Sequence, residues 1–389
     1  MKFNRITMPL GLLGLVSYGM VTTAFLAPPQ AQLSGPTNST KLGGPIGGLS
    51  AQEVGMFNRG LEVFDRDFHR STGLGAPGMN SDSCRGCHQD PVIGGAGGLE
   101  LNVSRFANDN GGAGPFTNLE GGQGLSKLFP PFVPFREECS LGADVFEQRQ
   151  TPSTLGLGLV SEIPDDVITA NEDIADSNLD GVFGVARRIN VNGHIEIGKF
   201  GWKAQLPLVT DFGRDAMLGE CGITTPDDSR SLTPNGDSDE VMDPELSFRD
   251  FEDLKMFMRL IAAPERKGST APEVAAGEIL FEQVGCAVCH IPTLAGPQGP
   301  VNLYSNLLLH NVMPTDFRGM SEDGAGVGMY RTAPLWGISD TAPYMHDGRG
   351  EDLDGAIRAH FSEGDSARVS YEGLTPEQQA ELIAFLEDL

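Results

Sequence analysis

The sequence has few basic residues, and this shortage excludes one class of partner. The 389 residues contain 27 lysines and arginines against 53 acidic residues, so the formal net charge is −26. A chain this acidic would repel nucleic acid, which binds proteins largely through counterion release to basic side chains. The same charge permits docking of a cationic protein, although acidity also serves solubility alone.

Long apolar runs are also missing after the first thirty residues, which excludes a later membrane-spanning helix. At the start of the chain, Lys2 and Arg5 precede an apolar run from Met8 to Leu26, and small residues follow. This order is typical of a signal peptide, with a membrane anchor as the alternative. We therefore predict that residues 1–31 are a signal peptide and lead-in, and that the protein is periplasmic or secreted with no stable membrane span.

Strand signals are scarce, so we predict a mainly α protein with long glycine-rich loops and one small hairpin between Gly184 and Lys199. A capping box at Ser50 and Glu53 predicts the start of a helix with one apolar face. A second capping box, at Thr375 and Gln378, predicts the last helix of the chain.

Cysteines are few as well, and four of the six lie in two Cys-x-x-Cys-His sequences. This sequence is the attachment signature of c-type haem, in which both thiols bind the porphyrin and the histidine ligates iron. Neither half supplies the second ligand pair that a zinc site needs. We therefore predict two covalently bound haem c groups, held by Cys84, Cys87 and His88 and by Cys286, Cys289 and His290.

The remaining cysteines, Cys139 and Cys221, form an even pair in a chain predicted to reach an oxidising compartment. A disulfide between them and two free thiols are both compatible with the sequence.

The surroundings of the two haem sequences repeat. Gly60–Phe64 resembles Gly277–Phe281, and Arg149–Pro152 resembles Arg331–Pro334. We therefore predict two cytochrome c-like domains related by internal duplication. An acidic linker would separate them, and a helix would follow it. The predicted ranges are 48–235 and 246–389 for the domains, 225–245 for the linker and 248–262 for the helix.

Several further segments resemble the di-haem c-type oxidoreductase family, also called thiol oxidoreductase-like. The chain is more distantly similar to the bacterial di-haem cytochrome c peroxidases. The resemblance covers nearly all of the mature chain and implies a peroxidase-like enzyme in which a C-terminal haem passes electrons to a reactive N-terminal haem. The segments are Gly73–Gly75 with Asn80, Gly94 and Gly97, Gly198–Ala204, Arg331–Gly337 and Thr341–Gly348.

The resemblance also implies a second axial ligand for the C-terminal haem. In the relatives this ligand lies fourteen residues beyond the position of His346, where this chain has His360. Leu353, Ile357 and His360 would share one face of a short helix, so the imidazole would point inward. A buried structural histidine is the alternative. Rival ligands by residue type are His310, His346, Met313, Met329 and Met345.

For the N-terminal haem, the position that matches His360 lies close to Arg214, and arginine does not ligate iron. We therefore predict an open iron that binds peroxide or another small oxidant, unless His69 or His194 closes it. The resemblance places the catalytic candidates on the distal side of the N-terminal haem. Lys203 is a neighbour of these candidates, and Trp202 could instead relay electrons between the haems. The candidates are Glu162, Gln205 and Trp202.

Oxygen ligands at alternate positions, Asp176, Asn178 and Asp180 followed by Gly181, are typical of a calcium loop. The twelfth position is Arg187, so the loop is not an EF-hand, and a metal-free turn is the alternative.

These observations predict a di-haem oxidoreductase whose partners are a small cytochrome or cupredoxin and a small oxidant. An electron carrier with two saturated haems and no catalysis is one alternative. A haem oxygenase that cleaves a polymer is another.

Overall fold

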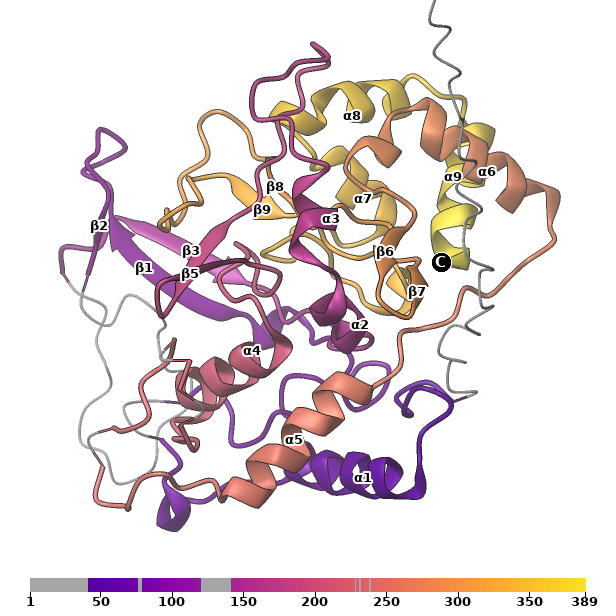
Figure 1. The fold of residues 1–389 in the computed structure, drawn as a ribbon. Coiled ribbons are helices and arrows are strands. Elements are labelled where there is room, and N and C mark those ends of the chain that lie inside the picture. The colour runs from indigo at the N-terminus through magenta and orange to yellow at the C-terminus, as the bar shows by residue number, and fades with distance from the viewer. Residues whose placement is uncertain (1–40, 76–78, 120–140, 228, 231, 238) are drawn as a thin grey trace, which may run out of the picture. The chain divides into compact units, whose positions relative to one another are not determined.

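The computed structural model describes residues 41–75, 79–119, 141–227, 229–230, 232–237 and 239–389 (Figure 1). Helices are more extensive than strands in these ranges, which agrees with the helical part of the fold prediction. The α-helices are α1 (Ala51–Asp65), α2 (Leu157–Glu162), α3 (Asp165–Thr169), α4 (Val209–Ala216), α5 (Phe248–Leu260), α6 (Pro272–Gln283), α7 (Leu353–Arg358), α8 (Asp365–Glu372) and α9 (Pro376–Asp388).

The strands are short and form more than the one predicted hairpin. That hairpin is present as β4 (Arg188–Val191) and β5 (His194–Ile197). The other sheets are β2-β1-β3, β6-β7 and β8-β9, all antiparallel. Their strands are β1 (Val103–Asn108), β2 (Thr117–Asn118), β3 (Val145–Arg149), β6 (Leu294–Gly296), β7 (Gly299–Val301), β8 (Leu309–Asn311) and β9 (Met329–Arg331).

Helix α1 begins where its capping box predicts. The Ser50 hydroxyl accepts a hydrogen bond from the Glu53 backbone N–H at 3.3 Å, and the Glu53 carboxylate accepts one from the Ser50 N–H at 2.8 Å. A reciprocal pair of the same kind, formed by Thr375 and Gln378, begins α9. Both helix starts satisfy backbone donors that would otherwise lack partners.

A glycine brings α1 close to α5, and the two helices lie side by side (Figure 1). A Cβ added at Gly60 would lie 2.0 Å from the Asp253 carbonyl oxygen and 2.7 Å from the Cβ of Phe257. The rings of Phe64 and Phe257 then meet with centroids 4.9 Å apart. Only a residue without a side chain permits this approach.

The same contact occurs between α6 and α9. A Cβ added at Gly277 would lie 2.0 Å from the Glu381 carbonyl oxygen and 2.7 Å from the Cβ of Phe385. The rings of Phe281 and Phe385 meet with centroids 5.3 Å apart. Each Cys-x-x-Cys-His sequence is therefore preceded by a helix that packs through glycine and phenylalanine on a later helix.

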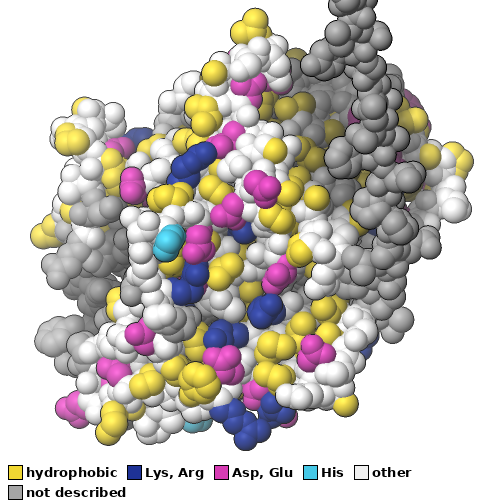
Figure 2. All heavy atoms as spheres, in the orientation of Figure 1, with side chains coloured by type: hydrophobic (Ala, Val, Ile, Leu, Met, Phe, Trp, Pro, Cys, Tyr) yellow, Lys and Arg dark blue, Asp and Glu magenta, His cyan; other side chains and the backbone are white. Residues whose placement is uncertain are grey.

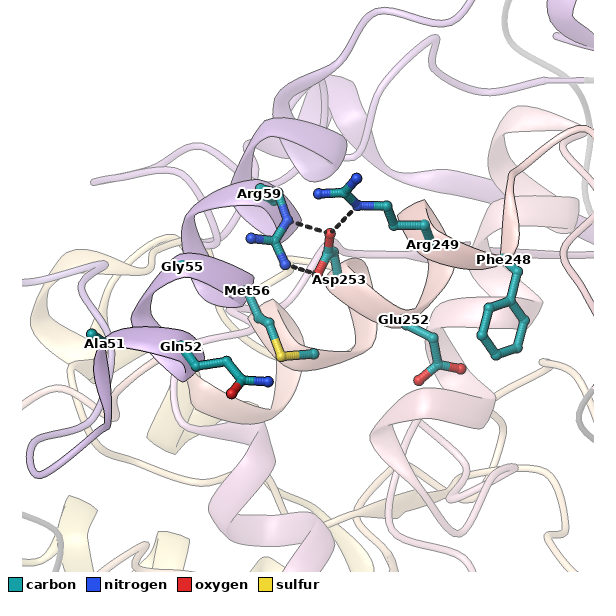
Figure 3. A pocket seen from close by; sticks show the side chains of 9 residues that line it. All are labelled: Ala51, Gln52, Gly55, Met56, Arg59, Phe248, Arg249, Glu252 and Asp253. Carbon is teal, nitrogen blue, oxygen red and sulfur yellow. Dashed lines mark hydrogen bonds and ion pairs between the residues drawn. The ribbon is translucent and has the colours of Figure 1, made fainter.

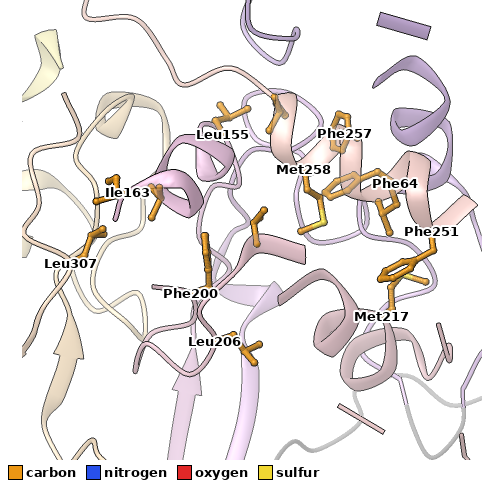
Figure 4. Close-up of a cluster of buried hydrophobic side chains, with 14 of the residues drawn as sticks. Phe64, Leu155, Ile163, Phe200, Leu206, Met217, Phe251, Phe257, Met258 and Leu307 are labelled. Atoms are coloured by element: carbon orange, nitrogen blue, oxygen red, sulfur yellow. The ribbon is translucent and has the colours of Figure 1, made fainter. Parts of the chain in front are cut away.

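The two helix pairs lie in different hydrophobic cores. The first core contains α1, α2 and α5 and reaches as far along the chain as Leu308, and Figure 4 shows many of its side chains. The second core lies between Val274 and Leu389. Helix α5 thus packs with the first core, although it follows the acidic linker in sequence.

A surface hollow of about 520 Å³ lies between α1 and α5 (Figure 3). At its edge, Arg59 forms two hydrogen bonds of 2.7 Å to the buried carboxylate of Asp253. Its lining contains no histidine or cysteine. This ion pair joins the two helices, and the hollow offers no group for redox chemistry.

A buried ionic network joins the β2-β1-β3 sheet to the later part of the chain. Glu322 lies 2.6 Å from Arg105 of β1, 3.4 Å from Arg149 of β3 and 2.8 Å from Arg187. Burial alone would raise the pKa of Glu322, but the arginines outweigh it and lower this pKa to about 2. Glu322 is therefore ionised at neutral pH and neutralises part of this positive charge.

On the surface, acidic and basic side chains are interspersed over the face that Figure 2 shows. In the part of the chain that the structure describes, no helix is long and apolar enough to cross a membrane. The predicted signal peptide lies outside the described residues and stays a prediction.

Candidate functional site

One cavity of about 340 Å³ is lined by residues of both Cys-x-x-Cys-His sequences. His88 lines it from the first sequence, and Cys286, Cys289 and His290 line it from the second. His360 also lines this cavity. The three histidines predicted as iron ligands therefore border a single space.

The orientation of these three histidines is fixed through one ring nitrogen. Each Nδ1 lies within hydrogen-bond distance of a backbone carbonyl oxygen: His88 3.2 Å from Gly95, His290 2.9 Å from Tyr304 and His360 2.8 Å from Ala356. A protonated Nδ1 leaves the Nε2 lone pair for a metal, and such hydrogen bonds are usual for histidine ligands.

The protonation state also fits iron ligation. Burial lowers the pKa of His88 and of His360, and it lowers the pKa of His290 to about 4. All three rings are therefore neutral at pH 7, the form that can donate a lone pair. The residues present thus fit haem iron.

The attachment sequences fold as tight turns. The His88 N–H donates to the Cys84 carbonyl oxygen at 3.0 Å, and the His290 N–H donates to the Cys286 carbonyl oxygen at 3.0 Å. Burial raises the pKa of the Cys84 thiol and of the Cys286 thiol to about 12. The hydrogen bond in each turn holds the histidine close to the first cysteine of its sequence.

His360 lies just beyond the helix that the sequence predicts to carry it. Helix α7 ends at Arg358, and the His360 N–H donates to the Ile357 carbonyl oxygen at 3.2 Å. The helix thus positions His360 through its last turn.

Of the three predicted catalytic residues, Trp202 alone lines the cavity. Its indole N–H donates to the Gln150 carbonyl oxygen at 2.8 Å. The Gln205 side chain instead accepts from the Lys203 backbone N–H at 3.1 Å. Glu162 is exposed and forms a 3.0 Å ion pair with Arg259. Glu162 and Gln205 are absent from the cavity lining because their side chains point to other partners.

His346 lines the cavity, and the sequence suggested it by residue type alone. It is 2% exposed, and neither ring nitrogen has a hydrogen-bond partner among the described residues. Its ring stacks on Tyr330 with centroids 3.7 Å apart, and burial lowers its pKa to about 3. The Gln150 N–H donates to the His346 carbonyl oxygen at 2.7 Å. The sequence did contain a signal for His346, because it lies in Thr341–Gly348, one of the segments that resemble the di-haem oxidoreductases.

The other candidate ligands divide by their position. His310 and Met345 line the cavity, but Nδ1 of His310 is held by Glu363 at 2.8 Å and its Nε2 lies 3.0 Å from the Asn306 side-chain nitrogen. Four others are absent from the lining, two of them exposed histidines and two of them methionines. These are His69, His194, Met313 and Met329.

The cavity wall includes apolar side chains of α2 and α4, Leu157 and Phe212, together with Phe200. Arg214, also on α4, is buried over the ring of Phe251 and does not line the cavity. The position that matches His360 in the repeat therefore offers no iron ligand to this wall.

The predicted calcium loop forms bonds within itself. The Asn178 side-chain N–H donates to the Asp180 carboxylate at 2.9 Å, and the Gly181 N–H donates to the Asp176 carboxylate at 3.2 Å. Asp180 reaches the cavity edge. Calcium binding stays a prediction.

A carboxylate cluster and the two remaining cysteines lie elsewhere in the sequence. Carboxylate oxygens of Asp237, Asp243 and Glu245 lie within 4.8 Å of one another, a group that the sequence did not predict. Cys221 is buried, whereas Cys139 lies outside the described residues, so their disulfide stays a prediction.

Comparison with known proteins matches one family model and a number of solved structures, two of which are described here. Residues 141–389 match the family described as "Di-haem oxidoreductase, putative peroxidase". A MauG-like protein associated with microbial copper homeostasis is 17% identical with a TM-score of 0.43, covering 90% of this chain and 93% of its own. The hydrazine synthase of Kuenenia stuttgartiensis is 15% identical with a TM-score of 0.37, covering 97% and 100%. No curated protein matches the chain.

Proposed function

Since the chain belongs to the di-haem oxidoreductase family and is an oxidoreductase, we propose that it is an exported enzyme with two covalently bound haem c groups. Its two cytochrome c-like units would derive from a duplication, and the repeated contacts of Gly60 and Gly277 support this origin. A small cytochrome or cupredoxin is the proposed electron donor. Peroxide or another small oxidant is the proposed acceptor.

The single cavity carries this proposal. Its lining includes a histidine from each attachment sequence, so the two haems would lie in one continuous space. When bound, haem supplies electron transfer and, where an axial position of iron is open, the binding of a small oxidant. Electron exchange between the two sites would then need no partner protein.

The residues around the second attachment sequence favour an electron-transfer role. His290 and His360 both present an Nε2 without a hydrogen-bond partner in the described structure, and both rings are neutral at pH 7. They would hold the C-terminal haem between them and leave no open axial position.

The residues around the first attachment sequence favour a reactive role. His88 would be the one axial ligand there, because the wall from α4 supplies Phe212 and not a metal ligand. His346 replaces Glu162 as the proposed proton-transfer group, since it is buried in the cavity wall, its ring nitrogens have no hydrogen-bond partner among the described residues, and its Nε2 lies 3.8 Å from the Asp347 carboxylate. Trp202 would line the space between the sites.

One observation favours the electron carrier as a second candidate. The ring nitrogens of His346, which accept and donate no hydrogen bond in the described structure, would also suit an axial ligand, and ligation by His346 would close the first iron. The enzyme and the carrier therefore differ in the number of axial ligands at His88.

Low-temperature EPR of the oxidised, haem-loaded protein, with and without cyanide, separates the two candidates. The enzyme should give one high-spin and one low-spin haem, and cyanide should convert the high-spin signal alone. Two low-spin haems that do not respond to cyanide would overturn the enzyme in favour of the carrier.

The His360→Ala variant tests the ligand of the second haem. It should convert the low-spin signal to high spin, because one axial ligand is lost. His194→Ala is the matched control, since His194 is exposed and away from the cavity lining. An unchanged spectrum in the His360→Ala variant would remove His360 as a ligand.

A further inference from the structure

Arg331 is a buried cation without a carboxylate partner. It is 8% exposed, and no carboxylate of the described residues lies within ion-pair distance of its guanidinium. Its Nε donates to the Gly201 carbonyl oxygen at 3.3 Å and its Nη1 to the Thr332 carbonyl oxygen at 3.1 Å. Burying an unpaired charge costs several kcal/mol in proteins, so a bound anion is expected nearby.

Three other buried arginines differ from Arg331. Arg105, Arg149 and Arg187 all reach the carboxylate of Glu322. Arg149 is the counterpart of Arg331 in the sequence repeat, and it also pairs with Glu147. The protein therefore neutralises this kind of charge with its own carboxylates at one position of the repeat and leaves it to another anion at the other.

Arg331 lies in the wall of the cavity, where its guanidinium can meet a bound group. Arg331 ends β9 and lines the cavity. Its backbone N–H donates to the Trp202 carbonyl oxygen at 2.8 Å, and the N–H of Thr332 donates to that of Leu308 at 2.9 Å. Arg331 thus stands between the segment of Trp202 and the strand β8 that follows the second attachment sequence. No described residue accepts a hydrogen bond from its Nη2.

We propose that the guanidinium of Arg331 binds a propionate carboxylate of a haem held in this cavity. This inference rests on the proposed function, because it requires haem there. Guanidinium and carboxylate groups match in a planar, two-bond geometry, and such a pair suits a buried guanidinium. Arg331 is then a positioning residue that also sets a haem potential.

The expected effect on the potential follows from charge. A fixed positive charge beside a haem favours the reduced form, which carries one positive charge fewer than the oxidised form. Arg331→Gln should therefore lower the reduction potential of one haem. We expect about a tenfold change in the reduction equilibrium constant, or about 59 mV for a one-electron couple. Arg331→Lys keeps the charge and should stay close to the wild type.

The test is a potentiometric titration of haem-loaded wild type, both Arg331 variants and Arg188→Gln. Arg188 is the matched control, because its half-exposed guanidinium pairs with Glu172 and its loss removes an equal charge. A fall of one potential in Arg331→Gln alone supports the proposal, and the haem that shifts identifies the propionate. Unchanged potentials in Arg331→Gln would overturn it.

Two further measurements keep the outcomes separate. A crystal structure of the haem-loaded wild type must place a propionate oxygen within about 4 Å of the guanidinium, and a longer distance would overturn the proposal even if a variant fails to fold. Added acetate that shifts the wild-type potential but not that of Arg331→Gln would assign the cation to an exogenous carboxylate instead. A protein whose mass shows no attached haem would refute the proposed function and the role of Arg331 with it, whereas unchanged potentials in the haem-loaded Arg331→Gln variant would refute the role of Arg331 alone.

Discussion

Replacing Gly60 by alanine should destabilise the protein, although alanine is the better helix former. A Cβ at this position would lie 2.0 Å from the Asp253 carbonyl oxygen and 2.7 Å from both the Asp253 carbonyl carbon and the Cβ of Phe257. These neighbours are backbone and a Cβ, so no side-chain rotation relieves the clash and α1 must move away from α5. Overpacking of this kind costs about 1–3 kcal/mol.

The matched control is Gly55→Ala in the same helix. A Cβ there would meet only the Arg59 guanidinium at 3.5 Å, an ordinary contact with a flexible side chain. Both changes gain the same helix propensity, about 0.5–1 kcal/mol, so the difference between the variants isolates the helix contact. Urea unfolding followed by circular dichroism should show Gly60→Ala to be about 1–3 kcal/mol less stable than Gly55→Ala. Equal stability of the two variants would refute the close approach of α1 and α5.

Two predictions concern buried charge. Glu322→Gln should lose about 3–5 kcal/mol at pH 7, because it leaves buried arginines without their carboxylate. Since the pKa of Glu322 is about 2 when folded and 4.5 otherwise, the wild type's advantage should be full above pH 4.5 and shrink as the pH falls toward 2, and a loss that is independent of pH in urea titrations would contradict this. Burial lowers the pKa of Lys203 from 10.5 to about 7, so the stability of the wild type relative to Lys203→Met should rise between pH 7 and 10.5. If the difference in unfolding midpoint between the wild type and Lys203→Met is the same at pH 6.5 and at pH 10, the result would count against a buried Lys203.

Local signals in the sequence predicted local structure well. The capping boxes at Ser50 and Thr375 lie at the starts of α1 and α9, because each depends on residues within one helical turn. Strands β1 and β3 escaped prediction. They pair Val103 with Arg149 across an interval that contains residues outside the described ranges, and no short pattern reveals such a pairing.

The candidate site followed the same division. The spacing of cysteine and histidine selected residues that line the cavity, and the resemblance selected His360, which lines it too; their roles as haem ligands stay predictions. The positions of Glu162 and His346 could not be read in this way. A side chain at the end of α2 turns toward Arg259 or the cavity according to packing with α5, which lies far along the chain. The lack of a carboxylate partner for Arg331 is equally a property of the whole fold, because its repeat counterpart Arg149 has two.

The packing of α5 on α1 bears on how the chain is made. A nascent chain that has emerged as far as the acidic linker holds Phe57 and Phe64 but not Phe257, which covers them in the finished protein. The first core also needs residues up to Leu308. Chains appear from the N-terminus onward, so this half stays incomplete until most of the second attachment region has been synthesised. The two halves of the sequence repeat therefore cannot fold one after the other during synthesis, and chaperones would meet a long, unfinished chain.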